Sequence, residues 1–123
     1  MNYALVFLGG GIGAVARYGL QGLVYRVVPP TFPYGTIVVN VVGSFLIGFL
    51  MTFFNERFLV SPSLRVFLTI GILGGFTTFS SFSYETIMLL RDGSIAAAVW
   101  NVVATMLMCL VATWIGMAVG KLF

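Results

Sequence analysis

The residues best suited to chemistry lie in one glycine- and hydroxyl-rich stretch, residues 71–83, inside a long apolar segment. Its sequence, GILGGFTTFSSFS, holds three glycines and five Ser or Thr residues. Glycine is a poor helix former, and Ser and Thr side chains compete for backbone hydrogen bonds. We predict two half-helices joined by a non-helical break at about residues 74–78; the alternative is a kinked but continuous helix. Such a break frees carbonyls for a cation and N–H groups for an anion.

Two further features near this stretch could contact an ion. Phe79 and Phe82 are three residues apart, on one face of the second half-helix. They are either core residues or a pair whose positive ring edges face a small anion. In the second apolar segment, Asn40 follows Thr36 by one helical turn. Its amide either bonds a neighbouring helix or faces an ion path, because intramembrane polar groups serve both roles.

The last apolar segment carries a polar stripe with a spacing of four residues, which places its members on one helix face. The stripe consists of Asn101, Thr105, Cys109 and Thr113. It either hydrogen-bonds neighbouring helices or lines a wet path. Arg17, a lone charge well inside the first segment, either extends to the interface or makes a vestibule attractive to anions. Of the acids, Glu85 alone falls within a segment, and carriers of cations usually need a buried carboxylate, so these residues favour an anion path.

The elements that must position these residues are membrane helices. The chain has 123 residues, 60% hydrophobic and 7% charged, with a mean hydropathy of +1.11. A soluble domain needs more polar surface, whereas a bilayer core of about 30 Å takes about 20 apolar residues per helix. We expect one all-α domain, 1–123, with four transmembrane helices at about 3–25, 34–54, 64–90 and 95–119. Ser61 and Pro62 are typical of an N-cap and first helical position for the third helix.

Glycine pairs four residues apart predict closely packed helices, because small residues let backbones approach in lipid. The pairs are Gly9 with Gly13, Gly71 with Gly75, and Gly116 with Gly120. Four spans place both termini on one side. The bases assigned to that side are Arg57, Arg65 and Lys121, and those assigned to the other are Arg26 and Arg91. This weak charge difference leaves both a single orientation and dual topology open.

The remaining composition excludes several function classes. The formal charge of +3 comes from bases scattered singly at segment ends, so we expect no nucleic-acid partner. The single Cys and the absence of His exclude a disulfide within the chain and any His-based metal or acid–base site. We expect that the protein is not an enzyme. The first apolar run lacks a basic leader region and an evident cleavage site, and we interpret it as mature structure rather than a signal peptide.

These motifs resemble the Fluc (CrcB) family of fluoride channels over essentially the whole chain. The most specific stretches are residues 35–44, GTIVVNVVGS, and 74–85, GGFTTFSSFSYE, with GAVARY at 13–18 in the first segment. The resemblance implies a passive, highly selective channel that exports fluoride from the cytoplasm across the bacterial inner membrane. It also implies an antiparallel, dual-topology homodimer in lipid, with two pores and a structural sodium ion at its centre.

The resemblance also implies roles for individual residues. Gly74 and Thr77 would hold the sodium ion through their backbone carbonyls. The anion path would be formed by Phe79, Phe82, Asn40, Ser81 and Thr36, with Arg17 at its vestibule and the polar stripe, including Thr105 and Thr113, as its track. Asn101 and Cys109 depart from the hydroxyl residues usual in the family, which leaves their role undefined. Neutral donors suit fluoride, because they replace its hydration without trapping it as a fixed charge would.

Two other functions compete with this interpretation. A small multidrug-resistance-type, proton-coupled efflux transporter also has four short spans in an inverted dimer. It needs a buried Glu in the first segment, where this chain offers only Arg17. The second competitor is a non-transporting membrane assembly subunit.

Overall fold

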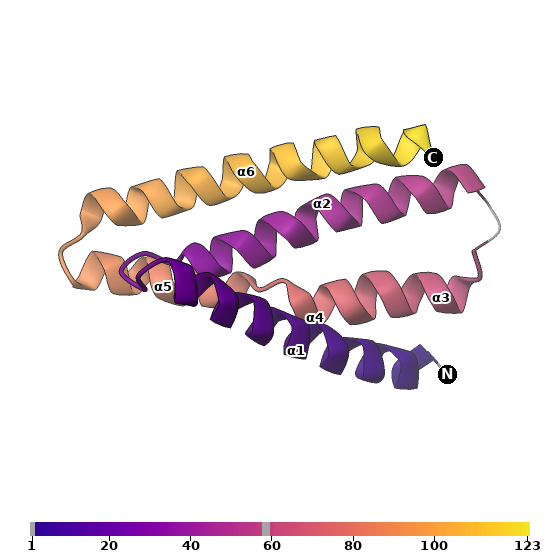
Figure 1. Ribbon diagram of the computed structural model, residues 1–123, viewed down its shortest axis with the longest axis horizontal. Helices are drawn as coiled ribbons and strands as arrows, with labels where there is room; N and C mark the ends of the chain where they lie inside the picture. The colour runs from indigo at the N-terminus through magenta and orange to yellow at the C-terminus, as the bar shows by residue number, and fades with distance from the viewer. Residues whose placement is uncertain (1, 58–59) are drawn as a thin grey trace.

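The computed structural model describes residues 2–57 and 60–123, which form a bundle of membrane-length helices (Figure 1). Four helical paths are long and apolar enough to cross a bilayer, as the composition predicts. The first two are α1 (Asn2–Val27) and α2 (Tyr34–Arg57), and the last is α6 (Ile95–Leu122). The third comprises α3 (Pro62–Val66), the π-helix η1 (Phe67–Leu73), α4 (Gly74–Phe76) and α5 (Phe79–Arg91). Most helix ends extend one to three residues beyond the expected spans.

The third path begins as its sequence predicts and then departs from a regular α-helix. The Ser61 side chain accepts a hydrogen bond from the Leu64 N–H at 3.1 Å, with a proline at the first helical position. The chain then widens into η1, a rare geometry that is frequent at functional sites. The helix is interrupted at Thr77 and Thr78, which are extended, with ψ of 159° and 118°. The continuous, merely kinked helix is therefore wrong.

The break is shorter than predicted, because the two glycines before it are helical. For Gly75, the surroundings give the reason. A Cβ on Gly75 would collide with the Gly10 carbonyl oxygen of α1, so this glycine permits close helix packing rather than unwinding. The extended residues are instead two threonines. The Thr77 N–H still donates to the Leu73 carbonyl at 3.1 Å, whereas the Thr78 N–H donates to Asn40 and the Thr78 hydroxyl accepts from the Ser81 N–H.

Close backbone contacts assemble the bundle in two pairs. The third path packs against α1, where a Cβ on Gly13 would collide with the Ile72 carbonyl oxygen. α2 packs most extensively against α6, where a Cβ on Gly116 would collide with the Phe45 carbonyl oxygen. The prediction that the glycine pairs mark close helix packing is confirmed.

The start of α1, the end of α2, the start of α3 and the end of α6 lie at one end of the bundle (Figure 1). The opposite end holds the α1–α2 connection and the tight turn between α5 and α6, in which Gly93 has a φ of 83°. This left-handed conformation favours glycine. The bases at each end follow the predicted sides, except that the side chain of Arg57 lies outside the described residues.

Candidate ion-conducting site

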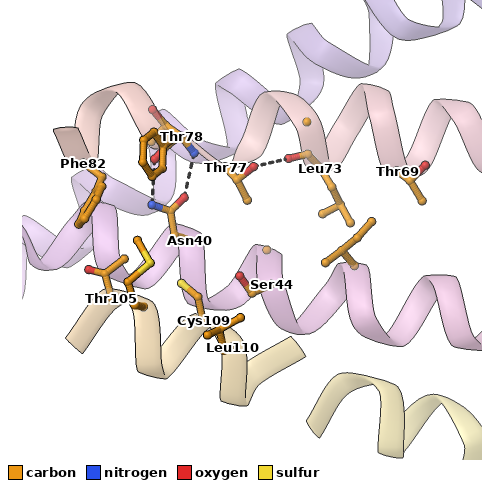
Figure 2. A pocket seen from close by; sticks show the side chains of 15 residues that line it. Asn40, Ser44, Thr69, Leu73, Thr77, Thr78, Phe82, Thr105, Cys109 and Leu110 are labelled. Atoms are coloured by element: carbon orange, nitrogen blue, oxygen red, sulfur yellow. Dashed lines mark hydrogen bonds between the residues drawn. The ribbon is translucent and has the colours of Figure 1, made fainter. Parts of the chain in front are cut away.

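A cavity of about 380 Å³ opens beside the break in the third path (Figure 2). Its walls come from α2, η1, α4, the break, α5 and α6. Six of the residues predicted from sequence line it together: Asn40, Gly74, Thr77, Phe79, Phe82 and Thr105. Ser44, Thr69, Thr78 and Cys109 contribute further polar or thiol groups. Within residues 2–57 and 60–123, the lining includes no charged side chain.

Asn40 holds the break open through both atoms of its amide. Its Nδ2 donates to the Thr78 carbonyl at 2.9 Å, and the Thr78 N–H donates to its Oδ1 at 2.8 Å (Figure 2). Thr78 is extended and therefore lacks the bonds that a helix would give its backbone. The two bonds to Asn40 take their place, because unpaired backbone groups are costly at membrane depth. The amide N–H₂ has a second hydrogen. Asn40 therefore bonds a neighbouring segment and also lines the cavity, so its two predicted roles are compatible.

The same contacts divert the donors that would normally satisfy two backbone carbonyls. In a continuous helix the Thr78 N–H would bond the Gly74 carbonyl, but it bonds Asn40 instead. The Ser81 N–H would bond the Thr77 carbonyl, but it donates to the Thr78 hydroxyl at 3.1 Å, an N-cap contact. The carbonyls of Gly74 and Thr77 are thus left without their helical donors. Among the described residues the Phe76 carbonyl likewise receives no bond from its helical donor, the Ser80 N–H.

Arg17 contacts the same break from α1. Its Nε donates to the Gly75 carbonyl at 3.1 Å, which satisfies another carbonyl whose helical partner lies beyond the break. The guanidinium does not line the cavity. In a single chain, Arg17 therefore acts first as a cap on the end of α4.

The two phenylalanines of α5 are neighbours in different environments. Their ring centroids are 5.4 Å apart with an interplanar angle of 48°. Phe82 is 6% exposed, whereas Phe79 is 70% exposed. Phe82 is thus both a core residue and a wall of the cavity. Phe79 stands at its rim, where lipid or another chain must cover it.

The remaining predicted residues lie away from the cavity lining. Thr36 is 2% exposed and accepts from Gln21 Nε2 at 3.4 Å, near the α1–α2 connection. The Ser81 hydroxyl accepts from the Thr78 hydroxyl at 3.1 Å. The Thr113 hydroxyl donates to the Cys109 carbonyl of its own helix at 3.0 Å. The polar stripe of α6 is therefore divided, with only its two middle members at the cavity.

Comparison with known proteins places this bundle in a family. A family model described as "CrcB-like protein, Camphor Resistance (CrcB)" matches residues 4–117. The chain belongs to the CrcB family. As a CrcB protein with four membrane-length helices, it is a multi-pass bacterial membrane protein.

Similar CrcB relatives share nearly the full length of the chain. The protein named fluoride-specific ion channel FluC of Geotalea daltonii is 53% identical over 119 residues, which cover 95% of this chain and 96% of the relative. That of Geobacter metallireducens is 52% identical, with 98% of each covered. That of Magnetococcus marinus is 45% identical, with 99% of each covered. The resemblance inferred from the motifs is confirmed.

Sequence reasoning missed several polar residues of this CrcB chain. Gln21 and Tyr25 join Thr36 near the α1–α2 connection, where the Tyr25 hydroxyl accepts from the Gly35 N–H at 3.0 Å. Glu85, which the sequence placed within the third segment without a role, has one buried carboxylate oxygen without a hydrogen-bond partner among the described residues. Gln21 follows Arg17 by one helical turn, so the rule that flagged intramembrane polar residues could have found it.

Proposed function

We propose that this chain is a passive, selective fluoride channel of the bacterial inner membrane, which lets fluoride leave the cytoplasm. The observation that carries the proposal is the uncharged cavity beside a helix break held open by Asn40. The relatives named fluoride-specific ion channel FluC, up to 53% identical over nearly the whole chain, support fluoride as the anion.

The cavity chemistry suits a small, strongly hydrated anion. A selective pore must replace the hydration shell with close donors, yet bind weakly enough to release the ion. The second amide hydrogen of Asn40 is a neutral donor in the lining, whereas the Thr105 hydroxyl there already donates its one hydrogen to Asn101. The rings of Phe79 and Phe82 add positive edges. A fixed positive charge in the lining would hold the anion more tightly and slow its release.

We infer further that two copies assemble as an antiparallel, dual-topology homodimer with two pores. The cavity rim supports this inference, because Phe79 is 70% exposed and Leu110 is 68% exposed at its edge. A second copy would cover these side chains and complete the wall of the pore. The weak difference in bases between the two ends suits insertion in both orientations.

A structural sodium ion at the dimer centre fits the backbone of the break. Unwound carbonyls are typical ligands for sodium in membrane proteins, and the Gly74 and Thr77 carbonyls lack their helical donors. The same carbonyls from two copies would hold the ion, which would supply positive charge and crosslink the two breaks. Replacing sodium by N-methyl-D-glucamine should then lower the dimer's melting temperature, and sodium titration should restore it. A melting temperature independent of sodium would remove the ion from the proposal.

The channel proposal is tested by fluoride efflux from liposomes under a potassium gradient with valinomycin. We expect rapid fluoride efflux and little chloride efflux. Equal rates for the two anions, or no fluoride efflux, would overturn the proposal. The alternative, proton-coupled efflux of quaternary ammonium, is disfavoured by the family match and by α1, whose intramembrane charge is Arg17. Substrate-driven proton movement in the same liposomes would revive it.

A further inference from the structure

We propose that Asn101 is a positioning residue for Phe82, acting through Thr86 across the interface between α5 and α6. The inference rests on the proposed fluoride conduction for its transport consequence. Its structural part, that one amide fixes how α5 sits against α6, stands apart from conduction and can be measured without it.

A directed chain of hydrogen bonds connects the two helices. The Asn101 Nδ2 donates to the Thr86 hydroxyl at 2.9 Å, and this hydroxyl donates to the Phe82 carbonyl at 2.7 Å. On the other side, the Thr105 hydroxyl donates to the Asn101 Oδ1 at 3.4 Å. The Asn101 amide and the Thr86 hydroxyl each accept one of these bonds and donate the next, so neighbouring bonds strengthen one another.

The burial of Asn101 argues for a positioning role. Asn101 is 1% exposed and is absent from the cavity lining, so it does not touch an ion there. Phe82 and Thr105, which stand at the two ends of this series of hydrogen bonds, both line the cavity. The amide therefore joins a ring on α5 to a hydroxyl on α6 from behind the cavity wall.

The start of α5 explains why such a link is needed. Thr77 and Thr78 are extended, so the direction of α5 is not continued from α4. Within its own chain, α5 packs chiefly against α6. In the described part of the protein, Asn101 to Thr86 is the one side-chain hydrogen bond between these helices. It fixes the rotation and height of α5, and with them the ring of Phe82.

The residue type also fits the task. An amide places its donor and its acceptor on separate atoms, so it can contact Thr86 and Thr105 at once. The unusual residue in the polar stripe thus forms the interhelical link, while Thr105 and Cys109 line the cavity. This assigns distinct roles to members of a stripe whose spacing alone treats them as equivalent.

The transport test compares four variants by fluoride efflux from liposomes, each relative to the wild type. Asn101→Ala removes the link, Thr86→Val removes its acceptor, and Thr86→Ser keeps the hydroxyl. Ser63→Ala is the control for loss of a hydroxyl, because the Ser63 hydroxyl bonds Asn2 at the start of the third path, away from α5 and α6. We expect about a 10- to 100-fold loss in the first two, as for supporting partners of ligand sites, and near-wild-type efflux in the other two. Equal efflux in Thr86→Val and Thr86→Ser overturns the inference. If Asn101→Ala does not fold, the comparison of the two Thr86 variants is the test.

Amide hydrogen exchange in nanodiscs provides the second readout. Asn101→Ala and Thr86→Val should raise exchange in the first two turns of α5 while leaving α1 unchanged, and Ser63→Ala should not raise exchange in α5. Unchanged exchange in α5 overturns the positioning role, whatever the efflux. A wild-type protein without fluoride efflux, but with this exchange pattern, would instead reject the proposed function and retain the link.

Discussion

Replacing Asn40 with Ala removes the two hydrogen bonds that hold the break, and the loss should affect both folding and conduction. The bonds measure 2.9 and 2.8 Å and satisfy the carbonyl and N–H of Thr78. Interhelical hydrogen bonds in membranes contribute about 0.6 to 2 kcal/mol each, so the pair contributes about 1 to 4 kcal/mol. A loss of about 2 kcal/mol already changes the ratio of open to rearranged break by about thirtyfold.

Asn40→Asp separates the two bonds at constant side-chain shape. The Oδ1 acceptor remains, but the donor becomes a second oxygen that faces the Thr78 carbonyl. We expect Asp to be at least as damaging as Ala, because it adds repulsion and a negative charge to an anion path. Ser44→Ala is the matched control, since Ser44 follows by one turn on α2 and lines the same cavity.

The assay measures fluoride efflux from liposomes together with the melting temperature in detergent. Both Asn40 variants should lose at least about tenfold in efflux and melt several degrees lower, whereas Ser44→Ala should stay near the wild type. Wild-type efflux and melting in Asn40→Ala would refute the claim that this amide holds the break. Reduced efflux in Asn40→Asp alone would indicate that charge, rather than lost bonding, limits the ion.

Three further substitutions test the remaining geometry. Phe82→Ile should lower both stability and fluoride efflux, whereas Phe79→Ile should lower efflux with little change in melting, since only the first ring is buried; equal effects on melting would contradict this division. Gly13→Ala should destabilise by about 1 to 3 kcal/mol in an SDS unfolding titration, because its methyl meets a backbone carbonyl, while Gly11→Ala, with open space, should not. Arg17→Lys keeps the charge but loses the Nε donor to the break, so efflux should fall; unchanged efflux would show that charge alone matters.

The sequence was most informative where one physical cause dominates. Lipid requires long apolar helices, so the four spans followed from composition and hydropathy alone. The existence of a break followed from the excess of glycine and hydroxyl residues. Its limits did not, because a glycine serves equally for unwinding and for close packing. The contact between Gly75 and α1 is a tertiary fact that no local pattern carries.

The candidate site was predictable by residue type but not by contact. Asn40 was identified because an amide in lipid needs a partner, yet nothing local indicates that the partner is the backbone of Thr78. The spacing of the α6 stripe treated its members alike, although the structure buries Asn101 against α5 and places Thr105 at the cavity. Spacing defines a helix face, whereas the neighbours of that face depend on how the other helices pack.

The break links cation and anion chemistry through a single amide. When Asn40 accepts the Thr78 N–H, the Gly74 carbonyl loses its helical donor and becomes available to a cation. The same amide retains a second N–H at the cavity wall, available to an anion. A variant that fails to hold Thr78 would have two effects at once. It would return a donor to the Gly74 carbonyl, and it would remove the Asn40 amide from the anion path. Sodium dependence of stability and fluoride efflux should therefore be lost in parallel in Asn40→Ala, whereas the phenylalanine variants should lose efflux and keep their response to sodium.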